Sequence, residues 1–520
     1  MSHDRASGLL LHITSLPGRH GIGDMGPEAY RFADYLVAAG QSLWQMLPIV
    51  PVGYGWSPYA APSTFAGNEL FISPDLLAED GLLPDGFLEE TPSFPEGDVD
   101  FEAVLRWKHK VLFAAWDLFS AGHAVPGHAA GDADSRAMRA RFDAFCRTEA
   151  HWLDDYALFE VLKDEHDRSE WMSWKEDYAM REEAAIAAAR AQFATRIERV
   201  KFIQFLFQEQ WQRLKTYCNK QGVRIFGDLP IYVAQDSADV WANRELFTLD
   251  ASGRATAVSG VPPDYFSATG QRWGNPIYRW DRMQETDYAW WTRRMARILD
   301  LVDLVRLDHF RGFEAYWEVA ASEETAVNGS WKQGPGADLF ESLERQLGRL
   351  PLIAENLGVI TDGVTDLMNR FGFPGMAILQ FAFDDGAANE FLPHNYREPL
   401  VAYTGTHDND TIMGWWSHTQ STQDQDVTKR AKAYCREYLD LECHPEEDIH
   451  WRAIRALMAS VARYVVIPVQ DVIGLGAEAR MNTPGLASGN WGWRLSEGQL
   501  DGAAAERLRE LARLFGRAPD

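Results

Sequence analysis

The chain has 520 residues, of which 46% are hydrophobic and 12% aromatic, and its formal net charge is −26 at pH 7. This length accommodates either about three ordinary domains or one large barrel with insertions. The excess of acidic residues argues against nucleic acid or an anionic membrane as a partner, because both would be repelled. The composition therefore favours a folded protein with a neutral or cationic ligand.

The amino-terminal residues 1–8 are polar and lack the apolar segment of a signal peptide. No stretch is long and apolar enough to span a bilayer. The four cysteines form no Cys-x-x-Cys pair, so the sequence indicates neither a zinc ribbon nor a disulfide framework. These features predict a cytoplasmic protein that does not enter the membrane.

The first elements are predicted to be a strand, a helix and a second strand. A short apolar run at 8–14 is followed by a glycine- and proline-rich loop. Apolar residues then recur at helical spacing between Ala29 and Val37, and Gly40 ends the pattern. A second apolar run at 42–49 follows at once. A strand, a helix and a strand in such close succession predict a parallel sheet.

A glycine- and aromatic-rich loop at 52–59 follows the second strand. Loops of this composition often line pockets, although an ordinary turn has the same composition. From about residue 75 to 200 the pattern changes to loops rich in proline and glutamate and then to charged, alanine-rich helices. We therefore expect a mainly helical insertion between strands two and three.

Strand-like runs resume at 223–233. The segment Gly260–Pro276 is long, aromatic and interrupted by glycine and proline, which is typical of a functional lid rather than of a linker. A helix is predicted around 288–299. Further on, Thr361 is suited to cap a helix that ends at Gly372.

In total the sequence predicts eight strands, which begin near residues 8, 42, 223, 303, 350, 376, 400 and 462. Eight strands separated by helices predict an α/β fold, a (β/α)8 TIM barrel. Strands one and two would lie in residues 1–74, the helical subdomain in 75–200, and the remaining barrel with its lid at 260–276 in 201–520. The residues after Asp471 are too few for a C-terminal β-sandwich of about 100 residues.

Three of the predicted strands carry an acid at their carboxyl end: Asp308, Glu355 and Asp408. On the first of them, the two-residue period places Arg306 and Asp308 on one face, where the arginine would keep the carboxylate ionised. Taken alone, a buried pair of this kind more often serves packing only. Because all carboxyl ends of a barrel meet at one mouth, the three acids are expected to lie together and to serve catalysis.

These acids and loops together make the sequence resemble the amylomaltases, or 4-α-glucanotransferases, of glycoside hydrolase family 77. The resemblance extends over nearly the whole chain. The motifs that carry it are Leu11-His12, Ser57–Tyr59, Gly227–Pro230, Asp236–Trp241, Val261–Pro276, Arg306–Gly312, Ala354–Gly358, Gly405–Thr411, Pro468–Asp471 and Ser488–Trp491.

The resemblance implies an enzyme that transfers α-1,4-glucan segments with retention of configuration, through a covalent glycosyl-enzyme. Asp308 would be the nucleophile, Glu355 the general acid/base and Asp408 the stabiliser of the transition state. The expected partners are maltose, maltotriose, longer maltooligosaccharides and amylose, and neither a metal nor an organic cofactor is expected. The substrate-binding residues that the resemblance implies are Tyr54, Tyr59, Asp228, Asp264, Gln271, Trp273, Arg306 and His407.

Three other functions are compatible with parts of this pattern. An α-glucan hydrolase of the amylase kind has the same acid trio, but the lid and the absence of a C-terminal sandwich favour the transferase. A metal-dependent barrel hydrolase would use His407, Asp408 and Asp410, yet such sites need histidines from several strands. A glucan-binding protein without activity would not need an acid at three strand ends.

Overall fold

The computed structural model shows a nearly closed barrel and describes residues 5–122, 132–263, 267–417, 425–443 and 448–519. Eight parallel strands are hydrogen-bonded in the order β10-β11-β12-β1-β2-β3-β6-β9. At the seam, the Ala354 N–H donates to the Pro374 carbonyl oxygen at 2.8 Å, so β9 lies beside β10. The strands are β1 (Ala6–Leu10), β2 (Leu43–Gln45), β3 (Arg224–Leu229), β6 (Leu304–Leu307), β9 (Leu352–Ala354), β10 (Gly375–Ile378), β11 (Leu400–Tyr403) and β12 (Tyr464–Pro468).

These strands confirm the predicted TIM barrel. The strands β1 and β12 are buried at every position, because helices cover the outside of the barrel and side chains fill its interior. Because both faces of these strands are buried, their sequences are continuous apolar runs rather than alternating ones. Every predicted strand position coincides with an observed strand.

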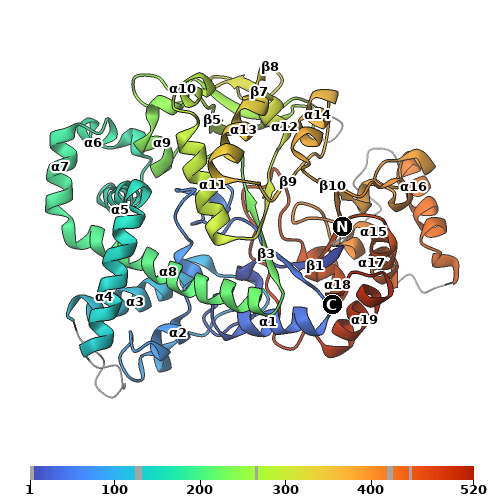
Figure 1. Cartoon of the computed structure of the whole chain (residues 1–520), viewed down its shortest axis with the longest axis horizontal. Coiled ribbons are helices and arrows are strands. Elements are labelled where there is room, and N and C mark those ends of the chain that lie inside the picture. Colours follow the sequence, from blue (N-terminus) through green and yellow to red (C-terminus); the bar gives the residue numbers. More distant parts are fainter. Residues whose placement is uncertain (1–4, 123–131, 264–266, 418–424, 444–447, 520) are drawn as a thin grey trace.

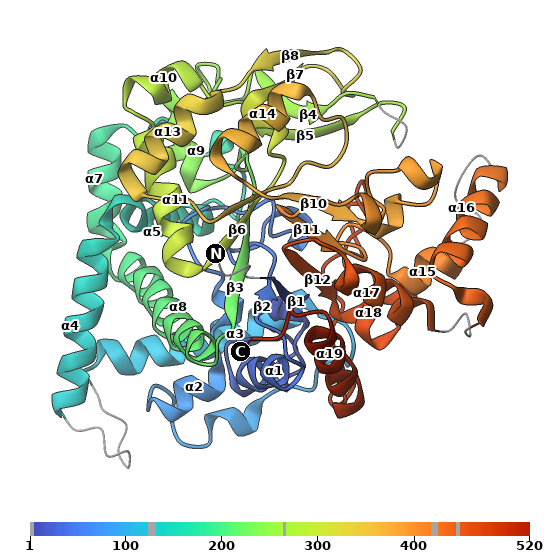
Figure 2. The same ribbon diagram turned by 45° about the vertical axis from the view of Figure 1, so that its right-hand side comes forward.

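The helices that cover the barrel follow the strands in turn (Figure 1). The predicted caps of α14 are confirmed, since the Thr361 hydroxyl accepts the Val364 N–H and Gly372 is left-handed. On α1 the predicted apolar face is buried except for Val37, which is exposed. The covering helices are α1 (Pro27–Ala38), α8 (Ala194–Lys220), α11 (Ala289–Leu301), α13 (Gly336–Leu347), α14 (Asp362–Phe371), α15 (Ile412–Ser417), α17 (Ile449–Ala459) and α19 (Gly502–Leu514). The helix α16 (Gln425–Tyr438) lies at the periphery, away from the barrel strands (Figure 2).

A group of helices between β2 and β3 lies on one side of the barrel (Figure 1). The long helix α8 begins in this group and runs on to β3, so residue 200 falls within one continuous helix. Rings of α3, α4 and α8 pack together here, with Phe119 and Phe202 stacked at 4.3 Å. The other helices of the group are α2 (Pro74–Glu79), α3 (Phe101–Ser120), α4 (Asp132–Thr148), α5 (Ala150–Glu165), α6 (Glu176–Ala179) and α7 (Glu183–Gln192).

A second, four-stranded antiparallel sheet has the order β5-β4-β7-β8 and stands at one end of the barrel (Figure 2). The segment expected as an irregular lid thus contains two paired strands, β4 (Ala257–Val261) and β5 (Gln271–Pro276). Their partners, β7 (Ala315–Ala320) and β8 (Gly329–Gln333), come after β6 in the sequence. Gly270 turns the chain into β5 with a φ of +66°.

Four short helices complete the described structure: α9 (Ala238–Ala242), α10 (Trp280–Glu285), α12 (Arg311–Glu314) and α18 (Val469–Ile473). Beyond β12, the residues that the structure describes form no further sheet. None of the described helices is long and apolar enough to cross a membrane.

Candidate active site

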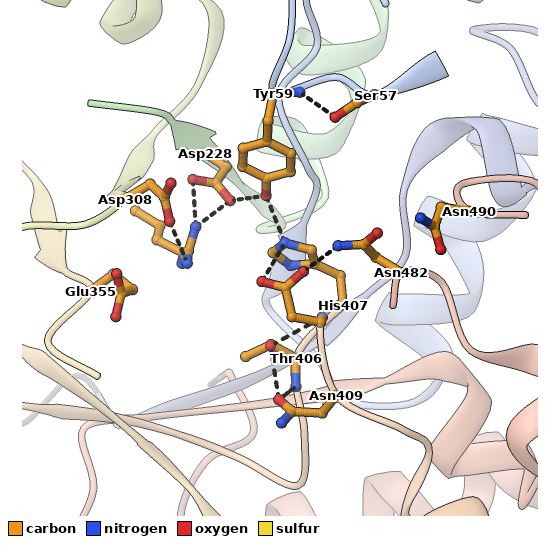
Figure 3. Close-up of polar contacts among 12 residues, drawn as sticks. Ser57, Tyr59, Asp228, Asp308, Glu355, Thr406, His407, Asn409, Asn482 and Asn490 are labelled. Atoms are coloured by element: carbon orange, nitrogen blue, oxygen red, sulfur yellow. Dashed lines mark hydrogen bonds and ion pairs between the residues drawn. The ribbon is translucent and has the colours of Figure 1, made fainter. Parts of the chain in front are cut away.

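The three acids follow three different barrel strands. Asp308 comes directly after β6, Glu355 directly after β9, and Asp408 lies on the loop after β11. Asp308 and Glu355 lie close to Asp228, Tyr59 and His407 in one cluster (Figure 3). The parallel barrel produces this convergence because the carboxyl ends of its strands meet at one mouth.

Arg306 joins two of the carboxylates in the cluster. Its Nη1 lies 2.9 and 2.7 Å from the two carboxyl oxygens of Asp228, and its Nη2 lies 2.8 Å from Oδ1 of Asp308. Burial acts to lower the pKa of Arg306, but the charges of Asp228 and Asp308 outweigh it and raise this pKa well above its usual value. The guanidinium is therefore a permanent cation that orients the Asp308 carboxylate.

Glu355 is held by backbone donors rather than by a cation. One carboxyl oxygen accepts the His309 N–H at 2.8 Å and the other accepts the Leu357 N–H at 2.7 Å. Burial raises the pKa of Glu355 to about 7, against the opposing charge of Arg306 and with the help of the like charge of Asp308. Near neutral pH this carboxyl group can therefore both give and take a proton.

Tyr59 connects Asp228 to His407. Its hydroxyl donates to Oδ2 of Asp228 at 2.7 Å and lies 2.9 Å from Nε2 of His407. Because the single hydroxyl proton goes to Asp228, the Tyr59 oxygen accepts from His407, which places a proton on Nε2. Burial lowers the pKa of His407, so the ring is neutral and its Nε2 proton is held by the Tyr59 oxygen.

Two residues that the sequence analysis missed hold Asp408. The Asn482 side-chain amide donates to Oδ1 of Asp408 at 2.6 Å, and its backbone N–H donates to the His407 carbonyl oxygen at 3.0 Å. Arg480 donates to the Asp408 carbonyl oxygen at 2.6 Å. Both come from the segment after α18, which has no periodic pattern, and only its Ser488–Trp491 end carries a recognisable motif.

The β4–β5 hairpin brings Trp273 and Gln271 near the acids. The Trp273 ring stands edge-on to the His309 ring at 4.7 Å, and its indole N–H donates to the Gln271 side chain at 3.2 Å. Tyr54 is 82% exposed on the loop that also carries Tyr59. Asp264 lies outside the described residues.

The residues named for a metal-dependent alternative make other contacts. His407 Nε2 lies 3.4 Å from Oδ2 of Asp408, while Asp410 accepts the Thr411 N–H at 2.8 Å. Within the part of the chain that the structure describes, no group of three or more His, Cys, Asp or Glu side chains is arranged to hold a metal ion.

Comparisons with known proteins agree on one family. The family model of glycoside hydrolase family 77, described as 4-alpha-glucanotransferase, matches residues 11–500. The 4-alpha-glucanotransferase of Synechocystis sp. is 46% identical over 520 residues, which cover 99% of each chain. That of Thermus thermophilus is 48% identical over 517 residues, which cover 98% of this chain and 99% of the relative.

Solved structures agree with the sequence comparisons. The amylomaltase from Streptococcus agalactiae in complex with acarbose has a TM-score of 0.91 and 37% identity, and the match covers 99% of this chain and 100% of that one. The amylomaltase from Corynebacterium glutamicum shares the fold, with a TM-score of 0.76 at 17% identity over 99% of this chain and 75% of that one. The chain therefore belongs to the 4-alpha-glucanotransferases of glycoside hydrolase family 77.

Proposed function

We propose that the acid cluster transfers α-1,4-glucan segments between maltooligosaccharides by a retaining double displacement. Family membership makes the protein a 4-alpha-glucanotransferase, an enzyme that acts on α-glucans such as maltose, maltotriose, longer maltooligosaccharides and amylose. The proposal adds the roles of individual residues and the order of the chemical steps.

In the first step, a carboxylate oxygen of Asp308 forms a bond to the anomeric carbon of the donor glucan. The bond from that carbon to the glycosidic oxygen breaks, and Glu355 gives its proton to the departing oxygen. In the second step, the 4-hydroxyl group of an acceptor glucan attacks the same carbon. Glu355 takes the hydroxyl proton, and the ester bond to Asp308 breaks.

The observation that carries these roles is the different environment of the two carboxyl groups. Arg306 pairs with one carboxyl oxygen of Asp308 at 2.8 Å and orients this carboxyl group, as a nucleophile requires. Glu355 is buried, and its pKa is raised to about 7, as an acid/base requires. A carboxyl group paired with arginine beside a buried carboxyl group of raised pKa is the pattern that glycoside chemistry uses.

The remaining groups of the cluster would hold the sugar. Asp408 would accept hydrogen bonds from ring hydroxyls as positive charge develops, and neutral His407, fixed by its hydrogen bond to Tyr59, would contact the same sugar ring. Tyr59, fixed by Asp228, would stack on the ring at the reacting centre. The further substrate-binding residues proposed are Arg306, Asp264, Gln271 and Trp273, with Tyr54 as an outer platform.

Transfer rather than hydrolysis requires that the acceptor reach the glycosyl-enzyme before water does. Water is far more abundant, so the site must exclude it and hold an acceptor in place. The β4–β5 hairpin with Trp273, opposite the loop that carries Tyr59, supports this function. An amylase-like hydrolase would use the same acids without this requirement.

The test is the product pattern from pure maltotriose. A transferase yields glucose together with a ladder of longer α-1,4-glucans, and the total number of reducing ends stays almost constant. If reducing ends rise in step with glucose and no longer oligomers form, the protein is a hydrolase and the proposal is wrong.

The organisation of the chain and its cellular location are proposals as well. We assign barrel strands one and two to residues 1–74, a helical subdomain to 75–200 and the rest of the barrel to 201–520. Packing of α3 and α4 on α8 supports the helical subdomain, and α8 continues from it through residue 200 towards β3. A cytoplasmic location is supported by the free thiols of Cys146, Cys218 and Cys435, which suit a reducing compartment.

A further inference from the structure

His309 directly follows the proposed nucleophile and has an unusual backbone conformation. Its φ is +49°, in the left-handed region that residues other than glycine seldom adopt. A non-glycine residue persists in this region only where the surrounding contacts determine it, and such residues are concentrated at functional sites. The contacts of this turn therefore indicate which function the strained backbone of His309 supports.

The turn at His309 is bonded to Glu355 at three points. The Glu355 N–H donates to the Leu307 carbonyl oxygen at 3.1 Å, and the Phe310 N–H donates to the Glu355 carbonyl oxygen at 3.0 Å. Between them, the His309 N–H donates to the side-chain Oε2 of Glu355 at 2.8 Å. The first two bonds align the backbones of the two strand ends, and the third fixes the carboxyl group itself.

The imidazole of His309 serves as an apolar support. Among the described residues it forms no side-chain hydrogen bond, and burial lowers its pKa to about 4, so it is uncharged at neutral pH. One side of the ring faces Trp273 at 4.7 Å. Another side lies over Gly312, where an added Cβ would stand 3.0 Å from the His309 ring. The ring thus fills the space between Trp273 of the hairpin and Gly312 of the turn.

We propose that His309 is a positioning residue that holds Glu355 through its left-handed N–H and couples this carboxyl group to the β4–β5 hairpin through Trp273. The inference rests on the proposed function, because it needs Glu355 as the acid/base. A glucan that presses on Trp273 would stabilise the turn, and the turn would keep the carboxyl group aimed at the glycosidic oxygen.

The proposal predicts a pH effect whose sign follows from the hydrogen bond. The N–H of His309 stabilises the carboxylate form of Glu355, as do Arg306 and the Leu357 N–H, while Asp308 acts in the opposite sense. If the His309 N–H is turned away, the pKa of Glu355 rises. Because the first step needs protonated Glu355, the basic limb of the kcat/KM profile then moves to higher pH.

The experiment compares two substitutions at one position. His309→Val removes the ring and also disfavours the left-handed backbone, because β-branched residues rarely adopt it. His309→Asn removes the ring, but asparagine tolerates this conformation, so the N–H stays directed at Glu355. The readouts are kcat/KM on maltotriose as a function of pH, and fluoride release in the first turnover of α-maltotriosyl fluoride, whose leaving group needs no acid.

We expect His309→Val to lower kcat/KM on maltotriose about 10- to 100-fold, within the range of general-acid contributions, and to shift the basic limb upward. First-turnover fluoride release should change far less. His309→Asn should keep the wild-type basic limb, and Trp273→Ala should have a smaller effect in the His309→Asn background than in the wild type. The proposal is overturned if His309→Val and His309→Asn lose activity equally on maltotriose and on the fluoride donor. It is also overturned if the effects of Trp273→Ala and His309→Asn on kcat/KM are additive.

The variant Glu355→Gln tests the acid/base role of Glu355 separately from the positioning role of His309. If that variant loses maltotriose transfer but keeps first-turnover fluoride release, Glu355 is the acid/base, and the His309 results test positioning alone. If Glu355→Gln releases fluoride as poorly as it turns over maltotriose, the role assigned to Glu355 is wrong, and the positioning proposal is overturned with it.

Discussion

At the scale of single residues, the site depends on Arg306 and on the contrast between the carboxyl groups around it. The guanidinium makes a two-point contact with buried Asp228 and a single contact with Asp308, whose side chain is 27% exposed. Lysine could not replace these contacts, since it lacks the planar fork. Exposure leaves the Asp308 carboxylate accessible to a sugar, while Asp228 serves to hold Arg306 and Tyr59.

Asp308→Asn should reduce transfer from maltotriose by orders of magnitude, because the amide cannot form the glycosyl ester. The fold should survive, since the substitution keeps the shape of a partly exposed side chain. Turnover and the melting temperature are to be measured side by side. Asp303→Asn, at the opposite end of the same strand, is the matched control and should keep its turnover. Near-normal turnover of Asp308→Asn would leave this acid with a structural role only.

Glu355→Gln should change the pH dependence of stability. Burial raises the pKa of Glu355 from the ordinary 4.5 to about 7 in the folded protein. In the wild type, the stability contributed by this group is complete below pH 4.5 and is lost as pH rises towards 7, because the unfolded state ionises first. The glutamine variant escapes this loss, which is on the order of 3 kcal/mol.

Unfolding of the wild type and of Glu355→Gln by denaturant between pH 4.5 and pH 7.5 measures this effect. The stability of the variant relative to the wild type should increase with pH across the interval. A difference that does not vary with pH would mean that Glu355 has an ordinary pKa in the folded protein.

At the scale of elements, two segments outside the barrel strands complete the mouth. The segment with Arg480 and Asn482 holds Asp408, and the Trp491 ring lies 5.7 Å from that of Tyr59. On the other side, the β4–β5 hairpin is supported by β7 through backbone pairing. Hairpins that are paired only along one edge open more easily than a barrel.

Gly270→Ala should open the hairpin without unfolding the barrel. Gly270 has a φ of +66°, and an added Cβ would stand 2.4 Å from the Val261 carbonyl oxygen, so the turn into β5 must shift. Water would then reach the glycosyl-enzyme more often, and KM for the acceptor would rise. We expect more reducing ends per glucose released from maltotriose, at a nearly unchanged melting temperature.

Gly97→Ala is the matched control for this hairpin substitution. Its φ of +78° is similarly unfavourable for alanine, but an added Cβ would meet nothing within 4 Å. It should leave the ratio of hydrolysis to transfer unaltered, and any loss of stability should be no larger than in Gly270→Ala. If both variants alter that ratio equally, the hairpin does not control access of water.

At the scale of the whole molecule, the last helix is joined to the first and last barrel strands. The buried guanidinium of Arg517 donates to the carbonyl oxygens of Met458 at 2.9 Å, Ser460 at 3.0 Å and Ala6 at 3.3 Å. These contacts bind the chain after α19 to β1 and to the segment that precedes β12. They satisfy carbonyl groups that water cannot reach.

Arg517→Ala should therefore destabilise the entire barrel rather than one end of it. Loss of hydrogen bonds from a charged donor costs about 2 kcal/mol, even though Arg5 still donates to the Ser460 carbonyl oxygen at 2.6 Å. Thermal unfolding should show a lower melting temperature for the whole transition. Arg509→Ala, which removes an exposed arginine of α19, is the control and should melt as the wild type does. A separate early transition in Arg517→Ala would contradict this expectation.

The barrel and the acid trio could be predicted from sequence because both are encoded locally. Each buried strand is a continuous apolar run with glycine or proline near its end, and Thr361 and Gly372 mark the ends of one helix. Asp308, Glu355 and Asp408 stand at strand ends, and the parallel topology then requires that they meet. The strand period also placed Arg306 beside Asp308, and recognition of the family motifs added Tyr59, Asp228 and His407; the structure brings these residues into the same cluster.

Only the tertiary structure decided which distant segments meet. The segment 260–276 was expected as a lid loop, but it contains the end of β4 and all of β5. These strands pair with each other, and β4 also pairs with β7, which follows β6 in the sequence. Asn482 and Arg480 carry no local pattern, and their role arises from contact with Asp408 across the mouth. Hydrophobic periodicity predicts a helix or strand from residues that are close in the sequence. Strand pairing and hydrogen bonds between remote segments depend instead on how the packed elements are oriented, which no local pattern contains.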